Sequence, residues 1–131
     1  MEPLIIEATE ASPAIKFDIM SNEFIISGKS RPENCNKFYE PVFVWLQEFE
    51  KSAPERLKAE GKPLTFTFKL EYFNSISAKY IADIILVLKE LALQGLTVNI
   101  EWNYPRFDDD MLDIGQEFSD MVDLKFDYIP Y

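Results

Sequence analysis

The sequence predicts an α/β fold in two layers, a mixed β-sheet with helices packed on one face only. Residues 63–72 and 96–104 alternate between apolar and polar side chains, which is typical of strands with one buried and one solvent-facing side. A sheet covered on both faces would be apolar throughout. Helical periodicity separates the later strands, so the expected order is three strands followed by three helix–strand repeats.

The composition indicates one compact domain spanning residues 1–131. The chain has 131 residues, 47% of them hydrophobic and 15% aromatic, which suits a single buried core and argues against disorder. Its net charge of −10 repels phosphate backbones and anionic lipids, so we expect neither nucleic acid nor membrane as a partner. A basic or neutral protein surface is the more natural partner.

The chain carries no pattern typical of export or membrane insertion. Its start, "MEPLIIEATEAS", has acidic residues where a signal peptide needs basic ones. The longest apolar stretch is interrupted by Asp83 and Lys89 and is too short to span a bilayer. The single cysteine, Cys35, has no partner for an internal disulfide. We therefore expect a cytoplasmic protein.

Several kinds of catalytic and cofactor site are excluded by composition. The chain has no histidine and one cysteine, which removes histidine-based triads, histidine metal sites and thiolate clusters. The stretch "GKS" at 28–30 is not a P-loop, because Glu23 stands where the earlier glycine is required. We expect no catalytic residue, no metal and no cofactor.

Three strands are expected before the first helix. "PLIIEA" at 3–8 has the composition of a strand, and "AIKFDI" and "FIISG" flank the polar turn "MSNE" at 20–23 as a hairpin.

The first helix is expected from about Cys35 to near Ser52. Pro41 should either start its regular part or kink it. "SAPE" at 52–55 has the order of a helix start, so a separate short helix is expected to reach Gly61. The core stripe of the first helix is Val42, Trp45, Leu46 and Phe49.

Two central strands follow from strict alternation. In residues 63–72 the side chains expected to face the core are Leu64, Phe66, Phe68, Leu70 and Tyr72. In residues 96–104 they are Leu96, Val98, Ile100, Trp102 and Tyr104.

The second helix is expected from near Ser77 to Gly95, with Ser75 or Ser77 as its N-cap. Its core stripe is Ile81, Ile84, Ile85, Leu88, Leu91 and Ala92. Three apolar residues lie off this stripe, and either neighbouring helices cover them or they form a docking surface. They are Leu86, Val87 and Leu93.

The third helix follows "RFDDD" at 106–110, and the last strand is "LKFDYI" at 124–129. Asp108, Asp109 and Asp110 would either bind a hard metal ion or cap the helix, and the absence of calcium-loop spacing favours capping. A hydrolase built on these carboxylates is the least favoured function class. The helix stripe is Met111, Ile114, Gly115, Phe118, Met121 and Val122.

Four stretches of the chain resemble the SiaC family of bacterial regulatory phosphoproteins. They are "SPAIKFD", "GKSRPENCNKFYEPVFVWL", "LEYFNSISAK" and "WNYPRFDDDMLDIGQEF", and they occur in the family's order over nearly the whole chain. The resemblance implies a fold like that of STAS-type anti-sigma-factor antagonists. It also implies a non-enzymatic role in biofilm control and cyclic-di-GMP signalling.

The resemblance implies regulation by partner switching. A cognate serine/threonine kinase phosphorylates one hydroxyl residue, a PP2C-type phosphatase restores it, and the unphosphorylated form regulates an effector such as a diguanylate cyclase. The family's Asn-Thr-Ser-Ser motif reads Asn74-Ser75-Ile76-Ser77 here, so the acceptor maps onto Ser75. The partner-binding residues are then expected to be Arg31, Glu33, Asn34, Tyr72, Asn74, Ser75, Ile76, Ser77 and Lys79.

The physical chemistry of this turn agrees with that expectation. A phosphate where a strand meets a helix lies at the positive end of the helix dipole, so it need not unfold the domain. It would add a charge of about −1.5 to −2 beside Glu71. Ile76, an apolar residue in a solvent-facing turn, would serve as an interface contact. The alternative is a STAS-like domain that senses a small molecule or nucleotide, with Ser75 only a helix cap.

Overall fold

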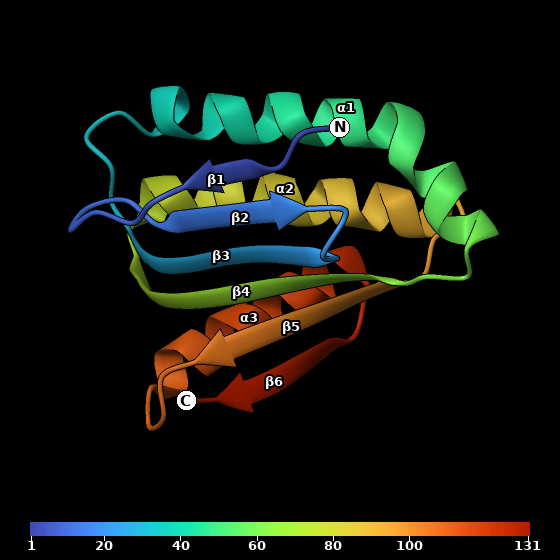
Figure 1. Ribbon diagram of the computed structural model, residues 1–131. Helices are drawn as coiled ribbons and strands as arrows, with labels where there is room; N and C mark the ends of the chain where they lie inside the picture. Colours follow the sequence, from blue (N-terminus) through green and yellow to red (C-terminus); the bar gives the residue numbers. More distant parts are fainter.

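The computed structural model describes residues 1–131, and its elements follow one another in the predicted order (Figure 1). The strands are β1 (Leu4–Ile6), β2 (Ala14–Asp18), β3 (Glu23–Ser30), β4 (Leu64–Phe73), β5 (Val98–Tyr104) and β6 (Phe126–Pro130). The helices are α1 (Cys35–Ala59), α2 (Ser75–Leu93) and α3 (Asp109–Val122).

The six strands form one mixed sheet in which spatial order equals sequence order, from β1 to β6. The first three strands are antiparallel neighbours, and β2 and β3 form the expected hairpin with Phe17 opposite Phe24. From β3 onwards the neighbours are parallel, because a helix carries the chain back before each new strand.

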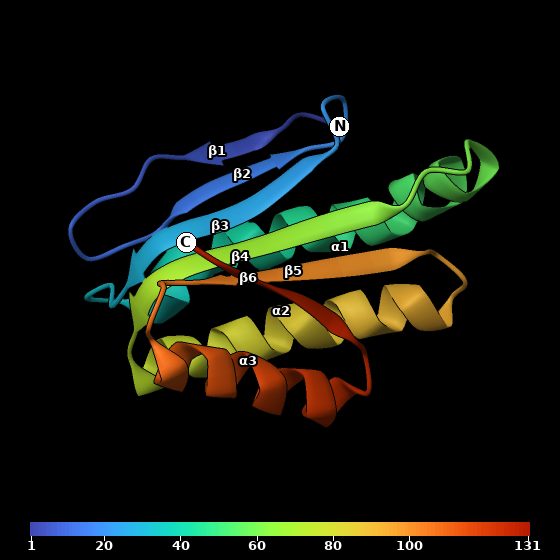
Figure 2. The ribbon, with the colours of Figure 1, turned by 90° about the horizontal axis from the view of Figure 1, so that it is seen from below.

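All three helices cover the same face of the sheet, as predicted (Figure 2). Along β4 the buried and less buried residues alternate, because only one side of the strand meets the helices. Aromatic side chains fill this layer; the rings of Phe66 and Phe68 lie 5.0 Å apart, and those of Phe68 and Trp102 lie 5.6 Å apart. The α/β prediction with helices on one face is thereby confirmed.

Helix α1 differs from the prediction because it is one continuous helix of 25 residues that contains both Pro41 and Pro54. The expectation of a separate short helix that starts at 52–55 and reaches Gly61 was therefore wrong. Ala53 and Pro54 are buried, so packing against the core outweighs the loss of one backbone hydrogen bond at the proline. The ribbon of α1 changes direction in its last third (Figure 1), as expected of a helix with an internal proline.

The alternation of β4 reverses near its end, so Tyr72 was wrongly assigned to the core. Gly28 pairs with Leu70, but the next residue, Lys29, pairs with Tyr72, which leaves Glu71 as the extra residue of a β-bulge. Beyond the bulge the faces exchange. Tyr72 is 48% exposed, while Phe73 packs against the core.

Helix α3 begins as the capping interpretation predicted. The Asp108 carboxylate accepts a hydrogen bond from the Met111 backbone N–H at 3.0 Å, and Asp109 and Asp110 lie in the first turn. No group of three or more acidic or cysteine side chains in the chain is arranged to hold a metal ion. The expectation that Met121 joins the core stripe was wrong, because its side chain is 51% exposed.

The apolar residues that lie off the stripe of α2 have different environments. Val87 is partly buried and packs against the core, whereas Leu86 and Leu93 are 45% and 67% exposed. No helix combines the length and the apolar character needed to cross a membrane.

Candidate functional site

The residues expected to bind a partner fall in two segments, 31–34 and 72–79, which meet at the carboxyl ends of the parallel strands β3 and β4. Ser30, at the end of β3, pairs with Phe73, at the end of β4. One residue further, the Asn74 backbone N–H donates to the Ser30 carbonyl oxygen at 3.1 Å. The connections that lead into α1 and α2 therefore start side by side.

Asn74, and not a serine, caps helix α2. Its side-chain oxygen accepts a hydrogen bond from the Ser77 backbone N–H at 2.8 Å, and α2 begins at Ser75, two residues earlier than predicted. The expectation that Ser75 or Ser77 is the cap was therefore wrong. Asparagine is as good a cap as serine because its carbonyl oxygen reaches the same N–H group. Both hydroxyls are left for other roles.

The Ser77 hydroxyl belongs to a buried polar network. Ser30 Oγ donates to Ser77 Oγ at 2.8 Å, and the Tyr39 hydroxyl lies 2.6 Å from Ser30 Oγ. The Cys35 sulfur lies 3.6 Å from Ser77 Oγ. Ser30, Ser77 and Tyr39 are each 0% exposed. The network joins the end of β3, the first turns of α1 and the first turn of α2.

Tyr39 is held between this network and an aromatic ring of α2. Its ring stacks on Tyr80, with centroids 5.2 Å apart and planes 10° from parallel. Burial raises the pKa of the Tyr39 hydroxyl to about 12, because the phenolate would be poorly solvated there. Tyr39 therefore acts as a neutral hydrogen-bonding group.

The Ser75 hydroxyl has the opposite environment. Ser75 is the first residue of α2, its side chain is exposed, and its hydroxyl makes no hydrogen bond to another protein group. Ile76 follows it and is 61% exposed. The turn thus presents a free hydroxyl and an apolar side chain to solvent, next to each other.

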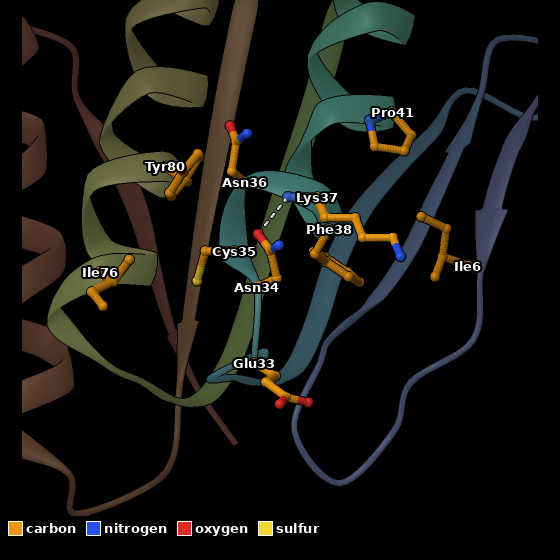
Figure 3. A pocket seen from close by; sticks show the side chains of 10 residues that line it. All are labelled: Ile6, Glu33, Asn34, Cys35, Asn36, Lys37, Phe38, Pro41, Ile76 and Tyr80. Atoms are coloured by element: carbon orange, nitrogen blue, oxygen red, sulfur yellow. Dashed lines mark hydrogen bonds between the residues drawn. The ribbon is translucent and has the colours of Figure 1, made fainter.

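A groove of about 950 Å³ lies beside this turn, between the first turns of α1 and α2 (Figure 3). Ile76 and Tyr80 border it on the α2 side, and Ile6 borders it on the β1 side (Figure 3). The remaining lining residues come from the β3–α1 connection and α1. They are Glu33, Asn34, Cys35, Asn36, Lys37, Phe38 and Pro41.

The structure brings some of the sequence-predicted site residues together and separates others. Glu33, Asn34 and Ile76 line the groove. Asn34 also caps α1, because its side chain accepts from the Lys37 N–H at 3.0 Å. Tyr72 is separated from the groove by the bulge, which turns it to the opposite face of the sheet from Phe73.

Seven groove residues were not predicted: Ile6, Cys35, Asn36, Lys37, Phe38, Pro41 and Tyr80. Five of them, between Cys35 and Pro41, lie in the stretch "GKSRPENCNKFYEPVFVWL" that carries the family resemblance, so the sequence signal marks the segment and not the individual residues. The contribution of Ile6 depends on tertiary placement, because β1 reaches the groove through pairing with β2.

The basic residues at this end of the fold have no carboxylate partners. The five ion pairs of the structure involve only residues 16, 23, 48, 51, 55, 56, 58, 60 and 62. Arg31, Lys37 and Lys79 are exposed and lie in none of these pairs. The site therefore combines free cations, an apolar groove and a free hydroxyl, which suits a protein-contact surface that a covalent modification could change.

Comparison with known proteins identifies the family that the whole chain resembles. The model of the SiaC family of regulatory phosphoproteins matches residues 6–131. An uncharacterized protein of Pseudomonas aeruginosa strain UCBPP-PA14 is 30% identical over 127 residues, which cover 96% of this chain and 94% of that protein.

Solved structures from Pseudomonas aeruginosa share the fold. The crystal structure of apo-SiaC superposes with a TM-score of 0.81 at 28% identity, covering 99% of this chain and 98% of that one. A chain from the crystal structure of the diguanylate cyclase SiaD in complex with its activator SiaC superposes with a TM-score of 0.85 at 26% identity. That match covers 98% of this chain and 99% of the other.

Proposed function

This chain belongs to the SiaC family of regulatory phosphoproteins, and we propose that it is an adaptor controlled by reversible phosphorylation of Ser75. The family is one of regulatory proteins, which agrees with the prediction that the chain is not an enzyme. The observation that carries the proposal is the contrast between the two serines. The Ser75 hydroxyl is exposed and free, whereas the Ser77 hydroxyl is 0% exposed and hydrogen-bonded.

The proposed cycle needs a kinase and a phosphatase. The kinase transfers the γ-phosphoryl group of ATP to Ser75 Oγ, the hydroxyl proton leaves to a base of the kinase, and ADP is released. A PP2C-type phosphatase then hydrolyses the ester with water, which restores the hydroxyl and releases inorganic phosphate. Because the kinase needs ATP, we place the cycle in the bacterial cytoplasm.

The proposed effector is an enzyme such as a diguanylate cyclase. One structural neighbour is SiaC in complex with the diguanylate cyclase SiaD, which it activates. We propose that the unphosphorylated form of this chain binds its effector through the groove and the exposed side of α2. Arg31, Glu33, Ile76 and Lys79 are the proposed contacts.

Phosphorylation would weaken that contact without unfolding the domain. The phosphate adds about −1.5 to −2 charges directly beside Ile76, an apolar residue that is 61% exposed. Burying Ile76 in an interface would then require removing water from a neighbouring dianion, which is costly. Of the other residues expected to bind a partner, Asn74 and Asn34 cap helices and Ser77 holds the turn. Tyr72 lies on the opposite face of the sheet from Phe73 and is not among the proposed contacts.

Affinity purification of the chain from its host, followed by mass spectrometry, tests the proposal. We expect phosphate on Ser75 in part of the material, and an effector enriched only with the unmodified part. Ser75→Ala should abolish the phosphate and retain the effector constitutively.

The matched control is Ser52→Ala, which removes an exposed hydroxyl in α1 far along the chain from the turn. It should leave both phosphorylation and effector binding unchanged. Unmodified Ser75 under every growth condition, with no kinase, phosphatase or effector in the eluate, would overturn the proposal in favour of small-molecule sensing.

A further inference from the structure

Four exposed residues of helix α2 lie in one row, which we call the α2 crest: Ser75, Lys79, Leu86 and Leu93. These positions repeat at helical spacing, so they lie on one side of the helix. Neighbouring helices cover both flanks. Tyr80 stacks on Tyr39 of α1, and Lys89 Nζ donates to the Asp123 carbonyl oxygen, 3.2 Å away at the end of α3.

Ser75 and Lys79 are neighbours on the crest. They are four residues apart, and side chains at that spacing have Cβ atoms about 5–6 Å from one another. Both are exposed, and neither is covered by α1 or α3. A phosphate on Ser75 Oγ and the flexible Lys79 ammonium can therefore meet without any change in the backbone.

The Lys79 ammonium forms no ion pair within the chain. The acidic groups on the surrounding elements include Asp83, four residues away on α2, Glu71 at the end of β4, Glu33 before α1, and Asp109, Asp110 and Asp113 on α3. None of them forms an ion pair with Lys79. By contrast, the basic residues in the second half of α1, Lys51, Arg56 and Lys58, are all paired.

We propose that Lys79 responds to phosphorylation of Ser75. Its ammonium group binds the phosphate within the molecule and is then no longer available to the partner. This inference rests on the proposed function of Ser75. In the unphosphorylated protein the free ammonium is available to a carboxylate of the effector. In the phosphorylated protein the adjacent dianion occupies it, so one modification removes a cation and adds an anion on the same surface.

Incorporation of phosphoserine at position 75 during translation of the 131-residue chain tests this inference directly. The second pKa of the phosphate, ordinarily about 6, is measured by ³¹P NMR titration. We expect Lys79→Gln to raise this phosphate pKa by about 0.2–0.4 units, the size expected of an i,i+4 ion pair. Lys79→Arg should restore most of the difference, and added salt should shrink it.

The control is Lys89→Gln, which removes the same charge from the same helix. Lys89 lies about 15 Å further along the helix axis than Lys79, beyond the screening length of about 10 Å at moderate salt. The Lys89→Gln variant should therefore leave the phosphate pKa unchanged. The Lys79 side-chain NMR signals should also shift between the phosphorylated and unphosphorylated chains, while those of Lys89 stay in place.

Equal phosphate pKa values in the wild-type and Lys79→Gln chains, with unmoved Lys79 signals, would overturn the inference. Since the phosphate is installed by translation, the result does not depend on whether a host kinase modifies Ser75. A failure here is therefore distinguishable from a failure of the proposed function.

Discussion

At the scale of single residues, the two serines of the turn have different roles. Ser77 is 0% exposed and accepts a hydrogen bond from Ser30, so it ties the start of α2 to the end of β3. Ser75 points to solvent and makes no such bond. Because Asn74 supplies the cap, neither hydroxyl is needed to start the helix. The Tyr39 hydroxyl belongs to the same buried network, so the ionisation state of Tyr39 affects the turn between β4 and α2.

Ser77→Ala and Ser75→Ala should have different effects on the free energy of unfolding. Removing the Ser77 hydroxyl takes the acceptor from a buried donor and should cost about 1–2 kcal/mol. Removing the exposed Ser75 hydroxyl should change stability by less than about 0.5 kcal/mol. Urea denaturation measures both, and an equal cost for the two variants would contradict the division of roles.

Tyr39 should make the stability of the protein fall at high pH. Burial raises its pKa from 10.0 to about 12, so the folded protein holds this proton more tightly than the unfolded chain does. Its contribution is complete below pH 10 and is lost between pH 10 and about 12, at up to about 1.4 kcal/mol per pH unit.

The variant Tyr39→Phe lacks this proton and is the control. Urea denaturation at several pH values in this range should show a shallower decline for the variant than for the wild type. Parallel declines in the two proteins would show that Tyr39 does not titrate in this way.

At the scale of elements, close contacts decide where each helix can lie. Helix α3 approaches β5 at Gly115, where an added Cβ would lie 2.5 Å from ring atoms of Trp102. The Trp102 ring is itself fixed, because Nε1 donates to the Met111 carbonyl oxygen at 2.9 Å. Glycine is thus required by packing, although it is an unfavourable residue for the middle of a helix.

Gly115→Ala should destabilise the protein despite the higher helix propensity of alanine. Propensity alone favours alanine by about 1 kcal/mol, but forcing Cβ into the fixed Trp102 ring should cost about 3 kcal/mol, which leaves a net loss of about 2 kcal/mol. Thermal unfolding followed by circular dichroism measures the difference. Gln116→Ala, on the exposed side of the same turn, should be neutral, and a stabilised Gly115→Ala would show that the helix can move away.

At the scale of the whole molecule, charge is distributed unevenly. The chain carries a net charge of −10, yet its ion pairs all lie away from the end of the fold that carries the groove, where Arg31, Lys37 and Lys79 are unpaired. Electrostatic attraction between these cations and a partner would therefore act at this end of the fold. It would weaken when a phosphate is added there.

Phosphorylation of Ser75 should leave the fold intact while changing this surface. The modified residue is exposed and loses no hydrogen bond. The Tm of the chain that carries phosphoserine at position 75 should therefore lie within about 3 °C of the Tm of the unmodified chain. Differential scanning calorimetry measures this shift. A fall in Tm of much more than about 3 °C would mean that the modification acts by unfolding α2. The control is a chain in which phosphoserine replaces the exposed Ser52.

Local patterns in the sequence by themselves determined the elements and their order. Alternation along residues 63–70 placed Leu64, Phe66 and Phe68 in the core, and all three are buried. Helical spacing did the same for Ile81 and Ile85. These predictions succeeded because periodicity depends only on neighbours along the chain and on which side of the element meets the core.

Only the tertiary structure decided the features that depend on contacts between distant segments. The bulge at Glu71 turned Tyr72 away from the core through pairing with β3, and burial kept α1 continuous through Pro54. The groove requires Ile6, Lys37 and Ile76 to meet from three different elements. The buried Ser30–Ser77 bond likewise joins residues 47 positions apart. No local sequence pattern encodes such long-range contacts, because they depend on strand pairing and on packing between elements.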